Sequence, residues 1–476
     1  MSVAKKGGST MIGITSVGAY IPRYRLSGEE IGRMWRTRRK GEKAVAGYDE
    51  DTVTMSVAAA LECMKGLSAP EALYYATTTA PYKEKQAASI VAGACDLVKT
   101  CRTADFTNTL RAGTTALLAA VDAVKAGASS AIVTASDCRL GAPMGRFESA
   151  LGDAACAIMI GSTDVLARIE GSYSVYREFS DVWRTSKDNF LQSGEGRFVD
   201  EMGYSPAMRE ALSDMMKKYS LGPADFAKVV FYAPDARRHA SIAKGLGFDK
   251  AQVQDSMYDA IGNTGAAAAL IMLVAALEEA SPGDRILFAG YGDGCDVLIL
   301  RVEKRPSGRS MKERLAKKVN IGYGSYLLWR ELLEVEPPSL PERPAPSLSS
   351  RWRMRDTISS LYGFKCRKCG TPQLHPLGQI VRVCVECQAK DDFERYKFSD
   401  KTGKLFTYAI DMLQPTKNPP GLNGVIDFDG GGRMLCELTD YDLEKAQVGL
   451  PVQMTFRRMS QERGIINYFW KAKPIE

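Results

Sequence analysis

Histidine is nearly absent from this chain of 476 residues, which contains only His239 and His375. Many hydrolases and acyltransferases pair their nucleophile with a histidine that acts as general base. The near absence of histidine therefore argues against a nucleophile–histidine pair, unless His239 reaches a nucleophile. We interpret His239 instead as a residue on the surface of a helix.

Long apolar runs are also missing. The longest, residues 266–277, covers about half of the ~20 residues that a membrane-spanning helix needs. The first ten residues contain no apolar stretch typical of a secretory signal. The eleven cysteines are too scattered for the disulfide framework of a small secreted protein. We therefore expect a cytoplasmic protein without a membrane anchor.

The composition is that of a globular protein, with 45% hydrophobic and 25% charged residues. The length predicts two or three domains rather than one. A formal net charge of +7 is modest for this length. It suits a small anionic ligand such as a phosphorylated cofactor and gives only weak support for nucleic-acid binding.

Strand and helix patterns alternate through the first two thirds of the chain. Buried strands are predicted at residues 11–17, 130–136, 154–160 and 228–232, and a strand beginning at residue 284 ends in a glycine turn. Ser27 is predicted to cap a helix, with Glu30 three residues later. Such alternation predicts an α/β architecture in which helices cover both faces of a sheet.

Two helices rich in small residues mark similar points of this pattern. One is predicted at residues 111–120 and the other begins at residue 262. Small side chains allow a helix to lie deep between sheets. The pair indicates an internal duplication with the two helices stacked at its centre, although chance similarity between two alanine-rich helices is an alternative.

The last third has a different composition. Residues 336–350 are rich in proline and predict a linker, and residues 351–361 predict a basic amphipathic helix. Two C-x-x-C pairs follow, formed by Cys366, Cys369, Cys384 and Cys387. Four thiolates from two short turns match the tetrahedral coordination of structural zinc, and they leave no open position for catalysis.

The final ~75 residues predict a small β-barrel. Strand patterns occur at residues 404–410, 424–429, 433–438 and 451–456. The strands lack the interleaved aromatic and basic side chains on which nucleic-acid bases stack. We therefore favour a docking or ligand-covering role over nucleic-acid binding.

Several runs of sequence resemble a known family. Residues 11–335 resemble the thiolase superfamily, and specifically the archaeal type of 3-hydroxy-3-methylglutaryl-CoA (HMG-CoA) synthase. The matching runs are residues 18–25, 49–52, 112–114, 262–264, 282–285 and 323–330. Residues 351–476 resemble the zinc-ribbon and OB-fold domain that accompanies thiolase-type enzymes, where it bridges subunits and helps to hold coenzyme A.

The resemblance implies a duplicated thiolase-type fold of α-β-α-β-α layers. The implied domains are a synthase-like domain at 1–335, the linker at 336–350, a helix plus zinc ribbon at 351–395 and an OB-fold at 396–476. Arg237 and Lys244 stand where basic residues of the family approach the phosphates of coenzyme A. An alternative is that both are solvated helix charges.

The resemblance also shows which catalytic groups are replaced. The family uses a cysteine that takes the acyl group, a glutamate that moves protons and a histidine that assists. Alignment on Pro81 and on residues 112–114 places Leu110 at the cysteine and Thr78 at the glutamate. Tyr232 occupies the position of the histidine. Of the family's polar site residues only the asparagine is retained, as Asn263, either to steady a thioester oxygen or as a turn residue.

Side-chain chemistry decides what these replacements allow. Leucine cannot form a thioester, and threonine has no useful pKa near neutrality. Cys95, Cys101 and Cys138 lie near the same region of the sequence. We interpret them as small structural thiols, with a relocated nucleophile as the alternative.

Three functions follow from the residues and the resemblance. The first is a catalytically degenerate acyl-CoA-binding subunit that forms homodimers and docks an active thiolase-type partner. The second is a cysteine-independent aldolase or acyltransferase that uses Tyr232 and Tyr291, although an ordinary tyrosine has a pKa near ~10. The third, which we favour least, is a nucleic-acid binder that uses the barrel and the basic residues 304–318.

Overall fold

The computed structural model describes residues 11–336, 347–374 and 382–475. The middle of the predicted linker, residues 337–346, and His375 lie outside this part of the chain. The chain divides into two compact units. The first comprises the residues up to Gly47, Asp51–Ala92 and Leu97–Tyr323, and the second comprises Tyr48–Glu50, Gly93–Asp96 and the residues from Gly324 onward.

A mixed sheet of nine strands organises the first unit. Its strand order is β11-β12-β13-β8-β1-β7-β6-β4-β5. The strands are β1 (Gly13–Tyr20), β4 (Ala72–Thr77), β5 (Arg102–Thr107), β6 (Ser130–Asp137), β7 (Ala154–Gly161), β8 (Ala167–Tyr176), β11 (Lys228–Phe231), β12 (Arg285–Tyr291) and β13 (Gly294–Val302).

The two halves of this sheet repeat one plan. In the series β4-β6-β7-β1 the first pairing is parallel and the next two are antiparallel. The series β11-β12-β13-β8 has the same three pairings in the same order. Antiparallel pairing of β1 with β8 joins the halves. The predicted duplication is therefore confirmed.

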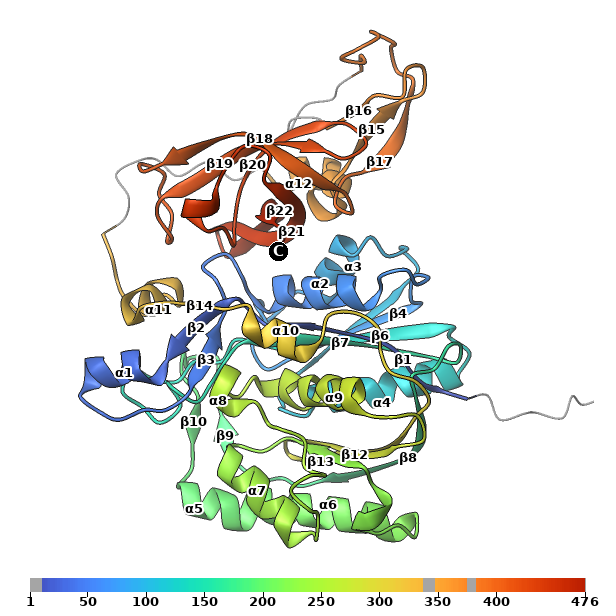
Figure 1. The fold of residues 1–476 in the computed structure, drawn as a ribbon, viewed down its shortest axis with the longest axis vertical. Coiled ribbons are helices and arrows are strands. Elements are labelled where there is room, and N and C mark those ends of the chain that lie inside the picture. The colour runs from blue at the N-terminus through green and yellow to red at the C-terminus, as the bar shows by residue number, and fades with distance from the viewer. Residues whose placement is uncertain (1–10, 337–346, 375–381, 476) are drawn as a thin grey trace, which may run out of the picture. The chain divides into compact units, whose positions relative to one another are not determined.

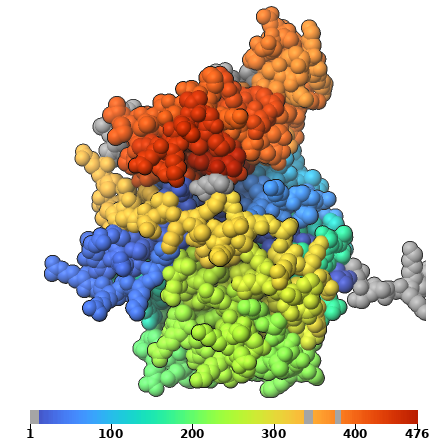
Figure 2. Space-filling view, viewed as in Figure 1, coloured from blue at the N-terminus to red at the C-terminus, as the bar shows by residue number. Residues whose placement is uncertain are grey.

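Helices and sheet halves form alternating layers (Figure 1). The middle layer contains α4 (Ala112–Lys125) and α9 (Ala268–Glu279), which lie between the two halves of the sheet. The outer layers contain α2 (Thr52–Cys63) and α3 (Ala87–Ala94) on one side, and α6 (Ser205–Lys218) and α7 (Ala236–Gly245) on the other. Figure 2 shows the green segments, α6 and α7 among them, as one continuous outer face of this unit.

Small residues allow the middle helices to pack so deeply. A Cβ atom at Gly113 of α4 would lie 2.7 Å from the backbone oxygen of Ala266, just before α9. Any larger residue at this position would force the two segments apart. Helix α9 is buried around most of its circumference, as expected for a helix that is apolar on all sides.

The remaining elements of the first unit surround this core. Ser27 caps α1 (Gly28–Trp35) by accepting a hydrogen bond from the Glu30 N–H at 3.1 Å, as predicted. Between β1 and α1, β2 pairs with β3 and β14. The smaller elements are β2 (Tyr24–Ser27), β3 (Glu42–Val45), β9 (Val182–Trp183), β10 (Gln192–Ser193), α5 (Gly196–Phe198), α8 (Tyr258–Ile261), α10 (Met311–Ala316) and β14 (Val319–Asn320).

The second unit contains two sheets. A three-stranded sheet is formed by β15 (Tyr362–Cys366), β16 (Pro372–Gln373) and β17 (Phe393–Lys397). A five-stranded sheet has the order β20-β19-β18-β21-β22. Its strands are β18 (Thr402–Asp411), β19 (Gly421–Phe428), β20 (Arg433–Glu437), β21 (Pro451–Glu462) and β22 (Ile465–Pro474). The last strand was missed by the sequence prediction, and it brings Trp470 into the core of the barrel.

The helices of the second unit correct a further prediction. Besides α11 (Tyr323–Trp329), two short helices, α12 (Leu348–Arg353) and α13 (Arg355–Ser360), replace the single helix predicted at residues 351–361. Met354, with φ −102° and ψ 15°, leaves helical geometry and separates them. Within the described ranges, no helix is long and apolar enough to cross a membrane.

Candidate functional site

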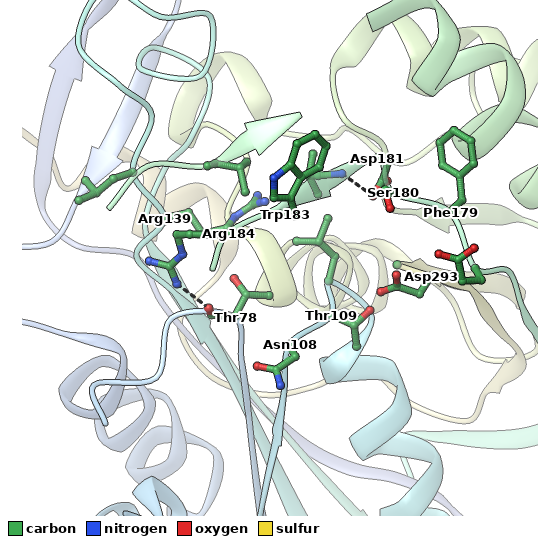
Figure 3. Close-up of a pocket in the computed structure, with 16 residues that line it drawn as sticks. Thr78, Asn108, Thr109, Arg139, Phe179, Ser180, Asp181, Trp183, Arg184 and Asp293 are labelled. Carbon is green, nitrogen blue, oxygen red and sulfur yellow. Dashed lines mark hydrogen bonds between the residues drawn. The ribbon is translucent and has the colours of Figure 1, made fainter. Parts of the chain in front are cut away.

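A pocket of about 320 Å³ opens where several strands of the first unit end. Thr78 follows β4, Leu110 precedes α4 and Arg139 follows β6, and all three line the pocket. The loop after β8 adds Asp181, and the turn between β12 and β13 adds Asp293 (Figure 3). Ligand sites of α/β proteins commonly occupy this position, outside the carboxyl ends of strands.

The positions predicted to replace the family's cysteine and glutamate do face this pocket. Leu110 is half-buried in its wall, immediately before the first turn of α4. The Thr78 hydroxyl donates a hydrogen bond to Asp137 Oδ1 at 2.9 Å, so its proton is already bound. Among the described residues that line the pocket there is no cysteine and no histidine. The pocket wall therefore offers no thiol nucleophile.

Asp137 holds the end of β4 and the start of α9 in place. Its fully buried carboxylate accepts hydrogen bonds from the hydroxyls of Thr77 and Thr79, at 3.0 and 2.8 Å. Its second oxygen accepts the backbone N–H of Ala266 at 2.8 Å. A buried carboxylate with this many hydrogen-bond donors is a structural anchor.

Asn263 lies at the centre of a second hydrogen-bonded group. Its Nδ2 donates to the hydroxyl of Tyr232 at 3.0 Å. Its Oδ1 accepts from Arg139 Nη2 at 2.7 Å and from the backbone N–H of Gly265 at 3.1 Å. Asn263 is only 4% exposed. It therefore connects Tyr232 to Arg139 of the pocket wall.

Tyr232 and Tyr291 lie behind the pocket rather than in its lining. Their rings stack with centroids 6.3 Å apart. Burial raises the pKa of both phenols, which keeps them protonated at neutral pH. The Tyr291 hydroxyl hydrogen-bonds to the carboxyl group of Asp181, and burial raises the pKa of Asp181 as well. Asp181 is therefore the group of this cluster that both faces the pocket and has a raised pKa.

The other candidate nucleophiles lie elsewhere. Cys95 is buried, and Cys101 and Cys138 are half-buried, but none of the three lines the pocket. Burial raises the pKa of Cys101, which disfavours the reactive thiolate.

The prediction of His239 as a surface residue is wrong. His239 is 5% exposed, with its ring centroid 4.4 Å from that of Phe231. Burial lowers its pKa to about 4, so the imidazole is neutral near pH 7. It lies on a helix, α7, as predicted, but on the buried face of that helix. It does not line the pocket.

Arg237 and Lys244 are exposed on α7. They lie seven residues apart, which is close to two helical turns, so they share one face of the helix. Neither lines the pocket. A phosphate contact by these two side chains therefore stays a prediction.

The four cysteines of the second unit come together as predicted. Their sulfur atoms all lie within 4.8 Å of one another. Cys366 Sγ is 3.6 Å from Cys387 Sγ, and Cys369 Sγ is 3.5 Å from Cys384 Sγ. Four sulfurs placed about 2.3 Å from a zinc ion form a tetrahedron with edges of about 3.8 Å. The donor set and its spacing therefore fit structural zinc.

Sequence reasoning missed Arg139, Asp181 and Arg184. All three line the pocket, and Arg184 Nη2 donates to the backbone oxygen of Thr78 at 2.8 Å. Arg139 could have been found, because a charged residue directly after a buried strand is a common feature of a ligand site. Asp181 and Arg184 lie in a long connection without a clear pattern.

Comparison with curated proteins gives close relatives over the first two thirds of the chain. A hydroxymethylglutaryl-CoA synthase of Pyrococcus furiosus is 32% identical over 332 residues, which are 66% of this chain and 95% of the relative. A hydroxymethylglutaryl-CoA synthase of Methanopyrus kandleri is 31% identical over 347 residues, which are 68% of this chain and 99% of the relative. The chain belongs to the hydroxymethylglutaryl-CoA synthase family.

Domain models and solved structures show the fold of the two units. Residues 216–302 match the model for the C-terminal part of 3-oxoacyl-[acyl-carrier-protein] synthase III, and residues 396–457 match the C-terminal OB-fold domain of ChsH2. An HMG-CoA synthase solved as a complex with CoA has a TM-score of 0.61 at 17% identity, covering 70% of this chain and 92% of that chain. MvaS in complex with 3-hydroxy-3-methylglutaryl coenzyme A has a TM-score of 0.58 at 21% identity, and the match covers 71% of this chain and 95% of that chain. The predicted thiolase-type fold and OB-fold are thus confirmed.

Proposed function

We propose that this chain is a catalytically degenerate, acyl-CoA-binding subunit that docks an active thiolase-type enzyme. The complex forms or cleaves a carbon–carbon bond next to a thioester. The observation that carries the proposal is Leu110, an inert side chain in the pocket wall. We align it with the cysteine that holds the acyl group in the family. Without a thiol or a histidine in the described lining, covalent acyl transfer has no starting group.

Binding of the acyl group is supported by the pocket itself. A volume of about 320 Å³ is at the lower end of the range for small-ligand sites, about 300 Å³ and upward. It suits an acyl group rather than a whole coenzyme A. The family relationship and the relatives solved with CoA support a thioester ligand. Arg237 and Lys244, both exposed on α7, are the proposed contacts of its phosphates.

The proposed partners rest on the domain composition. The OB-fold match and the four-cysteine cluster support a docking module of the kind found with thiolase-type enzymes. Strand β5 is the last strand of the nine-stranded sheet, so one of its edges is available for a second copy of the chain. We propose a homodimer through the first unit and a cytoplasmic hetero-complex through the second.

A cysteine-independent aldolase or acyltransferase is the second candidate. It is favoured by Asp181, which faces the pocket, is hydrogen-bonded to Tyr291 and has a raised pKa. A carboxyl group with a raised pKa can serve as a general acid. For this candidate, Tyr232→Phe is expected to abolish retro-aldol cleavage of a β-hydroxyacyl-CoA. Unchanged cleavage would remove Tyr232 from the mechanism.

The leading proposal is tested with the purified full chain. Calorimetry with CoA and acetyl-CoA is expected to show binding, and intact-mass spectrometry after incubation with acetyl-CoA is expected to show no added acetyl group. Co-purification from the native cell extract is expected to recover a thiolase-type enzyme. A covalent acyl adduct, or turnover of acetyl-CoA with acetoacetyl-CoA by the isolated chain at an ordinary enzymic rate, would falsify the proposal.

A further inference from the structure

A two-stranded hairpin forms part of the pocket wall. Its strands β9 and β10 pair antiparallel, and we call residues 182–193 the β9–β10 hairpin. The hairpin supplies four of the 16 residues that line the cavity, namely Val182, Trp183, Arg184 and Leu191. Access to the cavity therefore depends on where this hairpin lies.

The hairpin has little of its own surface buried. Between Asp181 and Gly203, which are both buried, every residue is half-buried or exposed. The turn of the hairpin is held by its own side chains, because Asp188 accepts hydrogen bonds from the N–H and the hydroxyl of Thr185, at 2.7 and 2.6 Å. A segment that keeps its own shape but buries few contacts can open locally while the rest of the domain stays folded.

Backbone hydrogen bonds hold the base of the hairpin. The Gly194 N–H donates to the backbone oxygen of Asp181 at 3.3 Å, and the Leu191 N–H donates to that of Leu140 at 2.9 Å. In the described part of the chain, residues 184–190 form hydrogen bonds to other segments only through two cationic side chains. The base is therefore fixed, whereas the turn is fastened by side chains alone.

These two side chains connect the turn to the segment between β4 and α3. Arg184 Nη2 donates to the backbone oxygen of Thr78 at 2.8 Å, along a dashed line in Figure 3. From the opposite direction, Lys83 Nζ donates to the backbone oxygen of Ser186 at 3.3 Å. Both cations are exposed, and hydrogen bonds of exposed groups exchange readily with water. The turn is therefore held closed by two bonds that are easily broken.

We propose that the β9–β10 hairpin is a lid on the pocket and that Arg184 is its latch. Breaking the bond to Thr78 lets the turn swing away from the segment after β4 and exposes Leu110 to solution. Arg184 is a positioning residue, because it acts through the hairpin. The inference deepens the acyl-CoA binding proposed above, since the closed lid would surround the acyl group, but opening of the lid is a property of the free protein.

The first test needs no ligand. In Leu110→Cys, iodoacetamide reaches position 110 chiefly through the open state, so the alkylation rate reports how often the lid opens. Adding Arg184→Met is expected to raise this rate about threefold to tenfold, the effect of one lost hydrogen bond. Loss of a nearby cation would by itself raise the pKa of the new thiol and slow alkylation, so a faster rate has to come from access. Arg184→Lys is expected to give an intermediate rate.

Arg197→Met is the matched control. Arg197 is also exposed and also donates a hydrogen bond of 2.8 Å, to Glu201, but it does not line the pocket. It is expected to leave alkylation at position 110 unchanged. Lys83→Met is expected to raise the rate by less than Arg184→Met, because its bond to Ser186 is longer. Peptide mass spectrometry separates the label at position 110 from label on the native cysteines.

Hydrogen–deuterium exchange locates the motion. In Arg184→Met the amide hydrogens of the β9–β10 hairpin are expected to exchange about threefold to tenfold faster than in wild type, with β6 and β12 unchanged. Saturating butyryl-CoA is expected to slow exchange of the hairpin in wild type, because a ligand that binds only under the closed lid stabilises the closed state.

Each contrary outcome has a distinct meaning. Equal alkylation rates for Arg184→Met and Arg197→Met overturn the inference. Faster exchange throughout the nine-stranded sheet also overturns it, because Arg184 would then stabilise the whole fold rather than a lid. Binding of butyryl-CoA without slower exchange of the hairpin overturns the lid and leaves acyl-CoA binding intact. If the ligand-free tests succeed and butyryl-CoA does not bind, the lid is supported and the proposed function is wrong.

Discussion

The side-chain amide of Asn263 donates a hydrogen bond to the hydroxyl of Tyr232 over 3.0 Å. This bond connects the two residues that the sequence analysis aligned with the family's asparagine and histidine. Oδ1 of the same amide accepts hydrogen bonds from Arg139 and from the Gly265 N–H. Asn263 therefore holds Arg139 of the pocket wall in place from a buried position.

Replacing Asn263 with alanine is expected to destabilise the first unit. The change leaves Arg139 Nη2 and the Gly265 N–H without their acceptor, at a cost of about 1–3 kcal/mol for each buried group left unsatisfied. Urea unfolding measures the loss, with Asn189→Ala, at an exposed position, as the control. A change equal to that of the control would contradict the central role of Asn263.

A cysteine placed at Leu110 is expected to be accessible from the pocket. Leu110 lines the cavity, so Leu110→Cys should react with iodoacetamide faster than the buried Cys156, whose pKa is raised by burial. Saturating butyryl-CoA, whose acyl group is proposed to occupy the pocket, is expected to slow alkylation at position 110 by about tenfold or more. Peptide mass spectrometry locates the label. Alkylation that butyryl-CoA does not affect would place the acyl group elsewhere.

Asp181→Asn is expected to stabilise the protein at neutral pH. The folded state raises the pKa of Asp181, chiefly through burial, so the folded protein prefers the protonated carboxyl. At pH values above the folded pKa the charged form carries a penalty, which disappears as the pH falls through the folded pKa toward the unfolded one. The free energy of unfolding of the variant should therefore exceed that of wild type at pH 7 and approach it in acid. A constant difference at all pH values would mean that the charge is not its cause.

Metal analysis is expected to find about one zinc ion per chain, held by Cys366, Cys369, Cys384 and Cys387. Cys384→Ser should lose the metal and unfold the zinc-ribbon sheet formed by β15, β16 and β17, because the binding free energy of such sites is folding free energy. Limited proteolysis of the second unit reports the loss. Cys101→Ser, which lies outside the cluster, should keep the zinc. Full zinc content in Cys384→Ser would contradict the assignment.

Much of the fold could be predicted because its signals are local. The alternating strands and the small-residue helices follow from the types of residue in each segment. The spacing of the two C-x-x-C pairs is itself the pattern of a metal site. Strand β22 was missed although its alternation is regular, and the predicted helix 351–361 divides at Met354, where no proline or glycine signals a break.

The site could be predicted only where the family motif covers it. Leu110 and Thr78 reach the pocket as aligned, whereas Tyr232 lies behind the lining and His239 is buried rather than exposed. Arg139 was not identified, although it follows a predicted buried strand. Its burial in the pocket wall and its hydrogen bond to Asn263 join segments far apart in the sequence, and these are decided by the tertiary fold.

The lining of the pocket, among the residues described, contains no sulfur, and this affects how peroxide can damage the protein. Enzymes that carry their acyl group on a thiolate lose activity when peroxide converts it to a sulfenic or sulfinic acid. This chain offers peroxide no such target in its pocket. Cys369 of the C-x-x-C turns is the one exposed cysteine of the described chain, so peroxide would meet the four-cysteine cluster before the more buried thiols of the first unit.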